Sequence, residues 1–488
     1  MPYAELLVGG VAATSLRPID QRGATVAWDF TTEPEFQAKL DWMSEFVGTE
    51  IEPIDELFGH FSFQPIEEPL KSLIDPMKQE VRDRGLWACH LDPELGGQGY
   101  GQLKLALMNE ILGRSSWASV IFGTQAPDTG NAEIIAAYGT EEQQRKWLQP
   151  LLNGEVFSCY SMTEPHGGSD PTQFKTRAVR DGDEWVINGD KFFSSNLRTA
   201  SFLIVMAVTN PEVSAYEGMS MFLVPSDTPG IHVLHNIGLG HEAIGEGMHA
   251  HVRYENVRVP AENLLGGEGK AFEVAQRRLG GGRIHHAMRS VATAQKHFDM
   301  MCERALSRFT QGSVLAKKQM VQEMIADSWI ELQQFRLLVM HTAWLIDQSS
   351  TREARMQIAA CKVVTARVLA DISHRCQHLH GALGVSNLMS LGGGGAVMAI
   401  VDGPTEVHKV SLARQVLRQY EASPDLWPTE FVPKKMIRAR RHFEALVDRR
   451  VTDDETRAAL GELLQRSRAN DEAVKQFEEY LDATLANL

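Results

Sequence analysis

The segment Cys159-Tyr160-Ser161-Met162-Thr163-Glu164-Pro165-His166-Gly167-Gly168-Ser169-Asp170 is the most informative stretch of this chain. A short apolar run leads into a Glu-Pro turn and then a Gly-Gly-Ser step. Glycine and serine at such a step let backbone N–H groups approach a ligand closely and bind anionic or acceptor atoms. Further on, strand-forming residues alternate from Trp185 to Asn196 on both sides of Asn188-Gly189, which predicts two strands joined by a hairpin turn. The two motifs together predict a β region that binds a ligand.

Composition limits the class of protein. A chain of 488 residues is too long for one core, so we expect two or three domains. The formal charge of −15 argues against nucleic acid or an anionic membrane as the main partner. The five cysteines form no Cys-x-x-Cys pair, which favours a reducing compartment. No apolar run has the length of a transmembrane helix and no basic leader begins the chain, so we expect a cytoplasmic protein without a signal peptide.

The residue pattern divides the chain into five segments. We expect an arm over residues 1–30 and a helical domain over 31–155, whose helices are predicted at Ile66–Arg84, Leu103–Arg114, Glu133–Tyr138 and Glu141–Leu152. From 156 to 270 β-branched and aromatic residues alternate between turns, which predicts a β-barrel or sandwich. Residues 271–420 carry three long helical patterns, typical of an antiparallel bundle, at Ile284–Phe309, Lys317–Gln348 and Arg352–His378. Residues 421–488 form a charged tail with helices predicted at Lys434–Arg449 and Asp453–Leu488.

The two motifs and the helical, β, helical order resemble the FAD-dependent acyl-CoA dehydrogenase family over roughly residues 35–420. Two further segments, Asp402-Gly403-Pro404-Thr405-Glu406-Val407-His408 and Ala126–Glu133, resemble family members ten and eleven and their bacterial relatives. The resemblance implies an α+β multidomain fold, with an N-terminal helical domain, a middle β-barrel or sandwich domain and a C-terminal four-helix bundle. It also implies α,β-dehydrogenation of an acyl-CoA thioester: the α-proton passes to a carboxylate base, a hydride to flavin N5, and electrons to an electron-transfer flavoprotein.

The resemblance puts Asp402 at the position of the catalytic base, where the family usually has a glutamate. A second family solution puts the base on a helix just before an arginine, but here that position is Gly282, before Arg283. Asp402 is therefore our candidate and Glu406 the fallback. An aspartate ahead of a helix that starts at Pro404 is also a capping residue, and both roles are compatible.

The resemblance assigns further residues to FAD and to the substrate. Tyr160, Met162 and Thr163 would lie at the isoalloxazine edge, and Gly168 and Ser169 near the pyrophosphate. The resemblance also assigns Phe193, Ser195 and Thr405 to FAD binding. For Phe193, plain core packing is the alternative. Ser169 and Arg283 would contact the CoA-linked part of the substrate, with Gly280-Gly281-Gly282 letting it pass close to a helix start.

Two more motifs are implied to reach the FAD. Arg308 and Gln319 match a pattern that contacts the flavin of a neighbouring subunit, which implies a homodimer or homotetramer. A solvated helix arginine is the alternative for Arg308. Gln377 or His378, followed by Gly381, would hold the adenosine side, whereas the segment Ser390–Gly395 is shorter than in relatives.

Other interpretations stay open. The residues His374, Cys376, His378 and His380 suggest a metal, but no carboxylate completes such a site, so we expect none. A flavin oxidase on the same scaffold would differ in the access of oxygen to the reduced flavin. A catalytically weak flavoprotein scaffold, with the tail as its binding element, is the third possibility.

Overall fold

The computed structural model describes residues 31–61, 66–91, 93, 97–239, 242, 244–389, 391, 394–420 and 431–485. The predicted arm over residues 1–30 lies outside them. The chain forms two compact units, Met1–Leu412 and Ala413–Leu488, which are described separately. In neither unit does a described helix have the length and apolar character needed to cross a membrane.

The first unit begins with helices of which α1 to α5 pack into the core of the helical bundle, whereas α6 and α8 pack into a core shared with the sheet. Their bounds are α1 (Pro34–Phe46), α2 (Glu52–Phe58), α3 (Leu70–Asp83), α4 (Gly101–Leu112), α5 (Ser116–Ile121), α6 (Asp128–Tyr138), α7 (Glu141–Gln143) and α8 (Gln149–Leu152). In α1 the buried residues Phe36, Leu40 and Met43 recur at helical spacing and therefore share one face. The helix predicted over Glu141–Leu152 is interrupted by a π turn at Gln144–Leu148.

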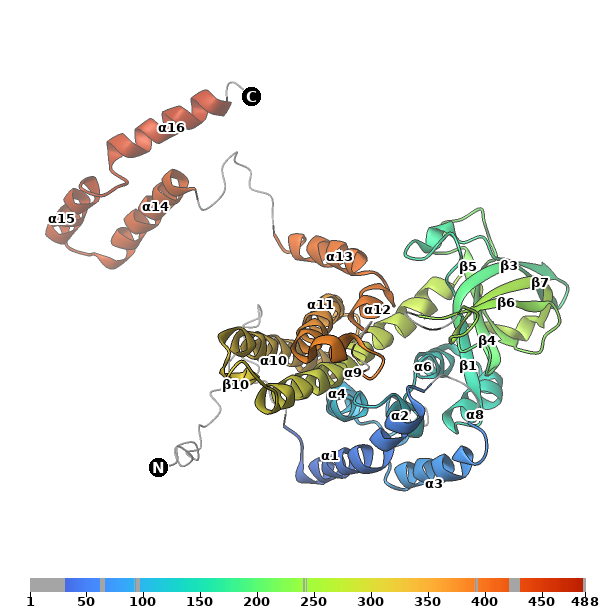
Figure 1. The fold of residues 1–488 in the computed structure, drawn as a ribbon. Coiled ribbons are helices and arrows are strands. Elements are labelled where there is room, and N and C mark those ends of the chain that lie inside the picture. The colour runs from blue at the N-terminus through green and yellow to red at the C-terminus, as the bar shows by residue number, and fades with distance from the viewer. Residues whose placement is uncertain are drawn as a thin grey trace. The chain divides into compact units, whose positions relative to one another are not determined.

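The middle of the unit is one eight-stranded sheet, visible in Figure 1. Its strands are β1 (Phe157–Ser161), β2 (Arg177–Asp181), β3 (Glu184–Ser195), β4 (Ala200–Val208), β5 (Met219–Pro225), β6 (Ile231–Ile237), β7 (His249–Pro260) and β8 (Leu264–Leu265). Within the described residues β6 and β8 are the two ends of the strand order β6-β7-β3-β1-β4-β5-β8, and β2 pairs with β3 and β4. The sheet is therefore open, which corrects the barrel alternative.

Strand β4 shows why this sheet positions the site. Phe202 and Ile204 belong to the core that the sheet shares with α6 and α8, whereas Leu203 and Val205 face a core enclosed by the sheet itself. Alternate residues point to opposite faces of a strand, so an uninterrupted apolar strand is buried on both sides. The strands thus form a rigid layer beside the helices.

The hairpin predicted at Asn188-Gly189 is wrong. Residues Glu184–Ser195 form the single strand β3, and its pairing with β7 shifts register between Ile187 and Gly189. Gly189 has φ 143°, and a Cβ there would lie 2.6 Å from Thr176 Cα, so only glycine fits. The Asn-Gly pair makes a bulge in a continuous strand because another backbone segment packs directly against it.

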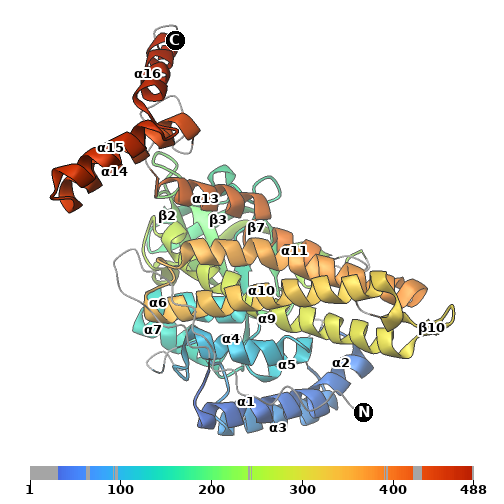
Figure 2. The ribbon, with the colours of Figure 1, turned by 90° about the vertical axis from the view of Figure 1, so that its left-hand side faces the viewer.

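The rest of the first unit is a helical bundle. It consists of α9 (Ala271–Ser307), α10 (Gln319–Gln348), α11 (Arg355–His380) and α12 (Gly394–Ile400), with the short hairpin β9 (Phe309–Thr310) and β10 (Ser313–Val314), and it leads into α13 (Thr405–Leu417). Figure 2 shows α9, α10 and α11 side by side, with α4 packed beside them. Helix α9 starts well before the predicted Ile284, so Gly280–Gly282 lie inside the helix and not at its start. The helical, β, helical order expected from the sequence is confirmed.

Beyond the end of α13, the described part of the second unit contains three helices, α14 (Val432–Arg450), α15 (Asp454–Gln465) and α16 (Asp471–Leu485). The single helix predicted from Asp453 to Leu488 is wrong, because α15 ends at Gln465 and a separate helix, α16, begins at Asp471. The side chain of Asn470 accepts a hydrogen bond from the backbone N–H of Ala473 (2.8 Å), which starts a new helix there. Arg440 of α14 pairs with Asp471 and so ties α14 to α16.

A buried ion pair fixes the Glu-Pro turn that follows β1. Glu164 Oε1 lies 2.9 Å from Lys191 Nζ, and both side chains are at most 1% exposed. Lys191 also donates to the carbonyl oxygen of Met162 (2.7 Å), while Glu164 accepts from the backbone N–H groups of Lys175 (2.6 Å) and Thr176 (3.0 Å). Both charges therefore have several partners, which is the condition under which a buried pair persists.

We predict that Lys191→Met lowers the free energy of unfolding by about 3–5 kcal/mol, because it leaves the Glu164 carboxylate buried and unpaired. Chemical denaturation measures the change. Arg258→Met, which breaks exposed pairs with Asp181 and Glu184, is the control and should cost about 1 kcal/mol or less. A loss for Lys191→Met no larger than that of the control would contradict the prediction, and Glu164→Gln/Lys191→Met should recover part of it.

Candidate active site

Three consecutive glycines of α9 form the surface on which the candidate site is built. A Cβ at Gly280 would lie 2.9 Å from Thr351 Cγ2, at Gly281 2.6 Å from Glu133 Oε2, and at Gly282 3.0 Å from Asp402 Oδ2. At such distances a side chain on α9 would displace the side chain that now lies there. The helix therefore has three glycines where three other segments of the chain reach its backbone.

The Asp402 turn is held against this surface by its backbone. Asp402 has φ 53° and Gly403 has φ 103°. A positive φ costs free energy at Asp402, because Asp402 is not a glycine. Arg283 Nε donates to the carbonyl oxygen of Asp402 (2.9 Å), and His408 Nε2 lies 3.3 Å from the same atom. These contacts hold the carboxylate so that it points at Gly282. Gly282 is the position at which the second arrangement found in the family has its base.

The carboxylate of Asp402 is 18% exposed and Oδ2 lies 3.5 Å from His286 Nε2. It is thus mostly shielded from solvent while still reachable. Glu406, the fallback candidate, is exposed in the first turn of α13. Thr405 begins α13, and its hydroxyl donates to the carbonyl oxygen of Ala399 (3.4 Å). The geometry favours Asp402 over Glu406.

A buried lysine that sequence reasoning missed supports the same turn. Lys362 of α11 is 1% exposed, and its Nζ donates to the carbonyl oxygen of Met398 near the end of α12. Burial lowers the pKa of Lys362 to about 8, although the negative charge of Asp402 opposes this shift. Because the Asp402 turn follows α12 directly, Lys362 positions it. The sequence feature that could have identified Lys362 is a lysine inside an otherwise apolar helical pattern.

Glu133 is a second carboxylate at this surface, and no role in the site was predicted for it from the sequence. It lies on α6 and contacts α9 at Gly281. Burial raises the pKa of Glu133 to about 7, although Arg278 and Arg277 oppose the shift. Burial likewise raises the pKa of Asp128, one turn earlier, to about 6. The helix α6 thus brings the carboxyl group of Glu133 next to the glycine surface.

The predicted FAD residues of the sheet gather near the start of α9. The guanidinium of Arg278 stacks on the ring of Tyr160, 3.7 Å from its centroid, and Arg278 Nε donates to Asn131 Oδ1 (2.9 Å). Tyr160 Oη lies 3.5 Å from Met162 Sδ, and the carbonyl oxygen of Thr163 accepts from Phe192 N–H (2.8 Å). The end of β1 and the start of α9 therefore face each other.

This region fits a flat, anionic cofactor such as FAD. Phe193 has φ 55° and its ring is 42% exposed, so an apolar face is available for stacking. Core packing, the alternative for Phe193, does not match that exposure. Ser195 Oγ lies 2.8 Å from His249 Nδ1. Gly168 and Ser169 are exposed and a Cβ at Gly168 would meet no atom within 4 Å, which leaves their backbone open to a phosphate.

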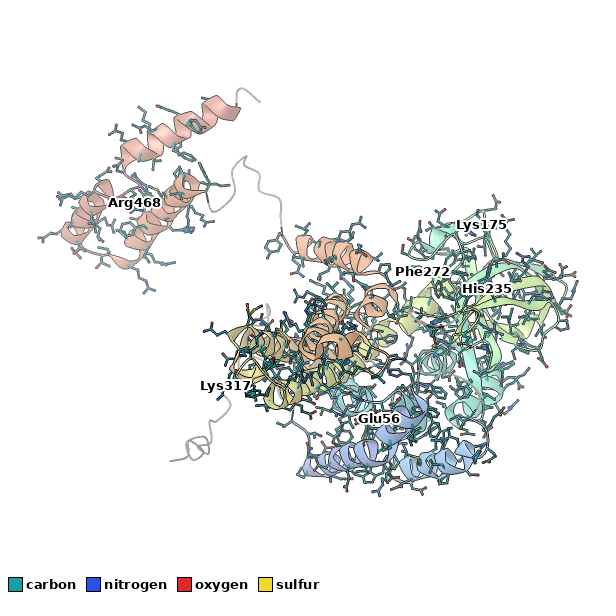
Figure 3. All side chains as sticks on the ribbon, in the orientation of Figure 1. Glu56, Lys175, His235, Phe272, Lys317 and Arg468 are labelled. Carbon is teal, nitrogen blue, oxygen red and sulfur yellow. The ribbon has the colours of Figure 1, made fainter. Side chains whose placement is uncertain are left out.

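The other predicted FAD residues lie at the opposite end of α9. Arg308 follows the last residue of α9, and Gln319 begins α10. The 30 residues from Arg278 to Arg308 span about 45 Å of helix. In Figure 3, Lys317, which precedes α10, lies at the edge of the helical bundle, whereas Phe272 near the start of α9 lies beside the sheet. One chain cannot bring both sets to a single FAD.

The loop predicted to hold the adenosine part of FAD lies with Arg308 and Gln319, at the far end of α9. Gln377, His378 and Gly381 lie at the end of α11, where His297 of α9 contacts Ser373 (2.9 Å) and Arg375 pairs with Glu331 of α10 (2.7 Å). Gly381 has φ 65° and ends the helix. His378 is exposed, whereas Gln377 is half-buried. The loop therefore shares an end of the bundle with Arg308.

Comparison with known proteins agrees with these elements. The family models for the N-terminal, middle and C-terminal domains of acyl-CoA dehydrogenase match residues 33–155, 159–257 and 269–417. A probable acyl-CoA dehydrogenase, FadE2 of Mycobacterium tuberculosis, is 40% identical over 418 residues, which are 84% of this chain and 98% of that protein. Acyl-CoA dehydrogenase family member 11 of Gallus gallus is 39% identical, over 84% of this chain but only 57% of its own length. The solved structure of a putative acyl-CoA dehydrogenase from Mycobacterium abscessus has a TM-score of 0.74 and 36% identity, over 80% of this chain and 100% of that one.

We predict that Gly282→Ala slows flavin reduction by an acyl-CoA about tenfold to hundredfold, because the new methyl group displaces the Asp402 carboxylate. Stability should not fall, since alanine favours a helix over glycine by about 1 kcal/mol. Stopped-flow absorbance and thermal unfolding measure the two effects. Gly461→Ala in α15, where a Cβ meets no atom within 4 Å, is the control. A Gly282→Ala variant as fast as this control would rule out the proposed contact.

Proposed function

This chain belongs to the acyl-CoA dehydrogenase family, and we propose that Asp402 is the base with which it removes the α-proton of an acyl-CoA thioester. Members of the family are FAD-dependent oxidoreductases that act in fatty acid metabolism. The observation that carries the proposal is the carboxylate of Asp402 beside Gly282, where the base can reach a substrate lying along α9.

Asp402 can serve as the base although it is shorter than glutamate. Its backbone turn is bonded to Arg283, and the missing side chain at Gly282 lets the whole turn approach α9 closely. The closer backbone offsets the missing methylene. Arg283 thus acts as a positioning residue for Asp402, and its predicted contact with the CoA-linked part of the substrate stays a prediction.

The reaction pairs a proton loss with a hydride loss. When bound, FAD supplies the hydride acceptor for the β-hydrogen. Asp402 takes the α-proton and holds it at its carboxyl group, while Tyr160, Met162, Thr163, Phe193 and Ser195 bind and orient the flavin ring. Gly168 and Ser169 would contact the pyrophosphate, and Thr405 the ring near the base. The α-carbon must therefore lie between the end of β1 and the Asp402 turn.

A homodimer or homotetramer would complete each FAD site. The partner's end of the bundle would supply Arg308, Gln319, Gly381 and either Gln377 or His378, because one chain holds these residues far from Tyr160. A guanidinium near a pyrophosphate forms charge-assisted hydrogen bonds. The long separation of the two sets along α9 is the observation that supports this arrangement.

The electrons would pass from the reduced cofactor to an electron-transfer flavoprotein. A flavin oxidase and a catalytically weak flavoprotein scaffold remain the alternatives. Consumption of oxygen as the sole acceptor distinguishes the oxidase. For the scaffold, no acyl-CoA would bleach the bound flavin. The ordered carboxylate beside Gly282 favours a working catalyst over the scaffold.

We predict that Asp402→Asn lowers the rate constant of flavin reduction by about 10²–10⁴-fold, because general-base catalysis contributes a factor of that size. Anaerobic stopped-flow mixing of the FAD-loaded protein with a panel of acyl-CoAs measures it. Glu406→Gln is the matched control, since Glu406 is exposed on α13, and it should keep the rate within about twofold. Equal losses in both variants would contradict the assignment.

We also predict that two inactive variants restore each other in a mixed dimer. Asp402→Asn removes the base, and Arg308→Glu should repel the pyrophosphate. If the site is shared between subunits, a dimer with one chain of each kind contains one intact site. Purification with two different tags isolates that dimer, and its FAD content and turnover are measured. Absence of any recovery would indicate that each FAD site is built from one chain and would contradict the shared site.

A further inference from the structure

Ser195 stands in a row of side chains that crosses three strands of the sheet. It pairs with Tyr160 of β1 on one side and with His249 of β7 on the other, and both pairings are antiparallel. Residues directly opposite each other on antiparallel strands point to the same face, so these three side chains share one face of the sheet. The resemblance assigns Tyr160 and Ser195 to the flavin and gives His249 no role. The row therefore puts an unassigned histidine beside two predicted flavin residues.

The ring of His249 contacts the predicted flavin residues of β3. Its Nδ1 lies 2.8 Å from Ser195 Oγ, and the ring stands edge to face with that of Phe193, with 5.7 Å between the centroids. The pairing of β3 with β7 shifts register between Lys191 and Ser194, and a bulge of this kind changes where the following side chains point. His249 thus packs against both the ring and the hydroxyl group that are predicted to meet the flavin.

Hydrogen bonds on the other face of the sheet hold the backbone at Ser195 in place. Ser194 Oγ lies 2.8 Å from Ser161 Oγ, which in turn lies 2.8 Å from Tyr254 Oη, and all three side chains are buried. These bonds join β1, β3 and β7 directly behind the row. The position of the Ser195 Oγ atom is therefore well defined, and its neighbours decide where the hydroxyl hydrogen points.

His249 Nδ1 is the close neighbour that can decide this direction. Among the described residues, the Ser195 hydroxyl has one other partner, the carbonyl oxygen of Phe193, to which it donates a long hydrogen bond of 3.4 Å. Burial lowers the pKa of His249, although the negative charge of Glu242 opposes the shift, so the ring is neutral at pH 7. A neutral imidazole has one donor and one acceptor nitrogen, and a hydroxyl has one hydrogen. If that hydrogen is donated to Nδ1, only lone pairs remain for a ligand; if Nδ1 donates, the hydrogen is free.

We propose that His249 is a positioning residue for FAD: it orients the Ser195 hydroxyl and thereby sets the relative affinity of this protein for oxidised and reduced FAD. The inference rests on the proposed function, because it takes Ser195 as a contact of the flavin ring. Oxidised flavin accepts hydrogen bonds at N5, whereas reduced flavin carries a hydrogen there. A hydroxyl held as a donor favours the oxidised form and one held as an acceptor favours the reduced form, so its orientation changes the reduction potential.

The reduction potential of bound FAD tests the inference without any acyl-CoA. The FAD-loaded protein is reduced anaerobically together with a dye of known potential, and the absorbance of both is followed. We expect His249→Leu to change the ratio of the dissociation constants for oxidised and reduced FAD at least tenfold, which is about 30 mV for this two-electron couple. A lower potential in the variant shows that Ser195 donates to His249 in the native pair, and a higher potential shows that His249 donates.

A double-mutant cycle connects this shift to Ser195. In the Ser195→Ala background, His249→Leu should change the ratio by less than about twofold, because no hydroxyl remains to be oriented. His251→Leu is the matched control, since His251 lies two residues further along β7 on the same face and contacts the rings of Phe192 and His235 (Figure 3). It should leave the ratio within about twofold of the native value.

Two polar variants separate the hydrogen bond from packing. His249→Asn puts an amide group near the position of Nδ1, whereas His249→Gln puts it near the position of Nε2. We expect His249→Asn to keep part of the native potential and His249→Gln to shift it as His249→Leu does. Both keep a polar side chain, so they give the same comparison if His249→Leu does not fold. Thermal unfolding and FAD content show that each variant is folded and loaded.

The outcomes separate the two proposals. If neither His249→Leu nor His249→Gln shifts the potential, or if the full shift persists in the Ser195→Ala background, the inference is wrong. The function of Asp402 then stands, because no substrate enters this measurement. If the purified protein takes up no FAD, the proposed function itself fails.

Discussion

The close approach of three segments to the backbone of α9 is the constraint on which the site depends. Each glycine inside a helix costs about 1 kcal/mol relative to alanine, so three in a row weaken α9 locally. Tertiary packing against α6, Thr351 and the Asp402 turn offsets that loss. The same packing puts the Asp402 carboxylate at the side-chain position of Gly282. The strained backbone at Asp402 is tolerated because Arg283 holds its carbonyl oxygen.

The length of α9 ties catalysis to assembly. Its start faces the flavin-binding end of β1, and its far end presents the residues that resemble a contact to a neighbour's flavin. A cofactor site divided in this way, as we propose, would exist only when two copies associate. The helix therefore acts as a spacer, and the buried Glu164–Lys191 pair stabilises the turn that the cofactor must meet.

Sequence patterns predicted the order of domains and the identity of the candidate base, because periodic apolar residues and short motifs are local signals. They failed where a distant segment decides the conformation. Asn188-Gly189 suggested a hairpin, yet Thr176 packs on it and forces a bulge in β3. Gly280–Gly282 suggested a helix start, yet the helix continues because its glycines receive Glu133 and Asp402. Lys362 was marked only by its place inside an apolar helical pattern, since its role arises from burial beside residues far along the chain.

The central claim is that the Asp402 carboxylate and the side-chain position of Gly282 reach the same point in space. Moving the base from one to the other tests it directly: Asp402→Gly should abolish flavin reduction by an acyl-CoA, and the double variant Asp402→Gly/Gly282→Glu should restore it by at least about tenfold. The measurement is the rate constant of flavin bleaching under anaerobic conditions. A double variant that binds FAD and remains as slow as Asp402→Gly would contradict the account.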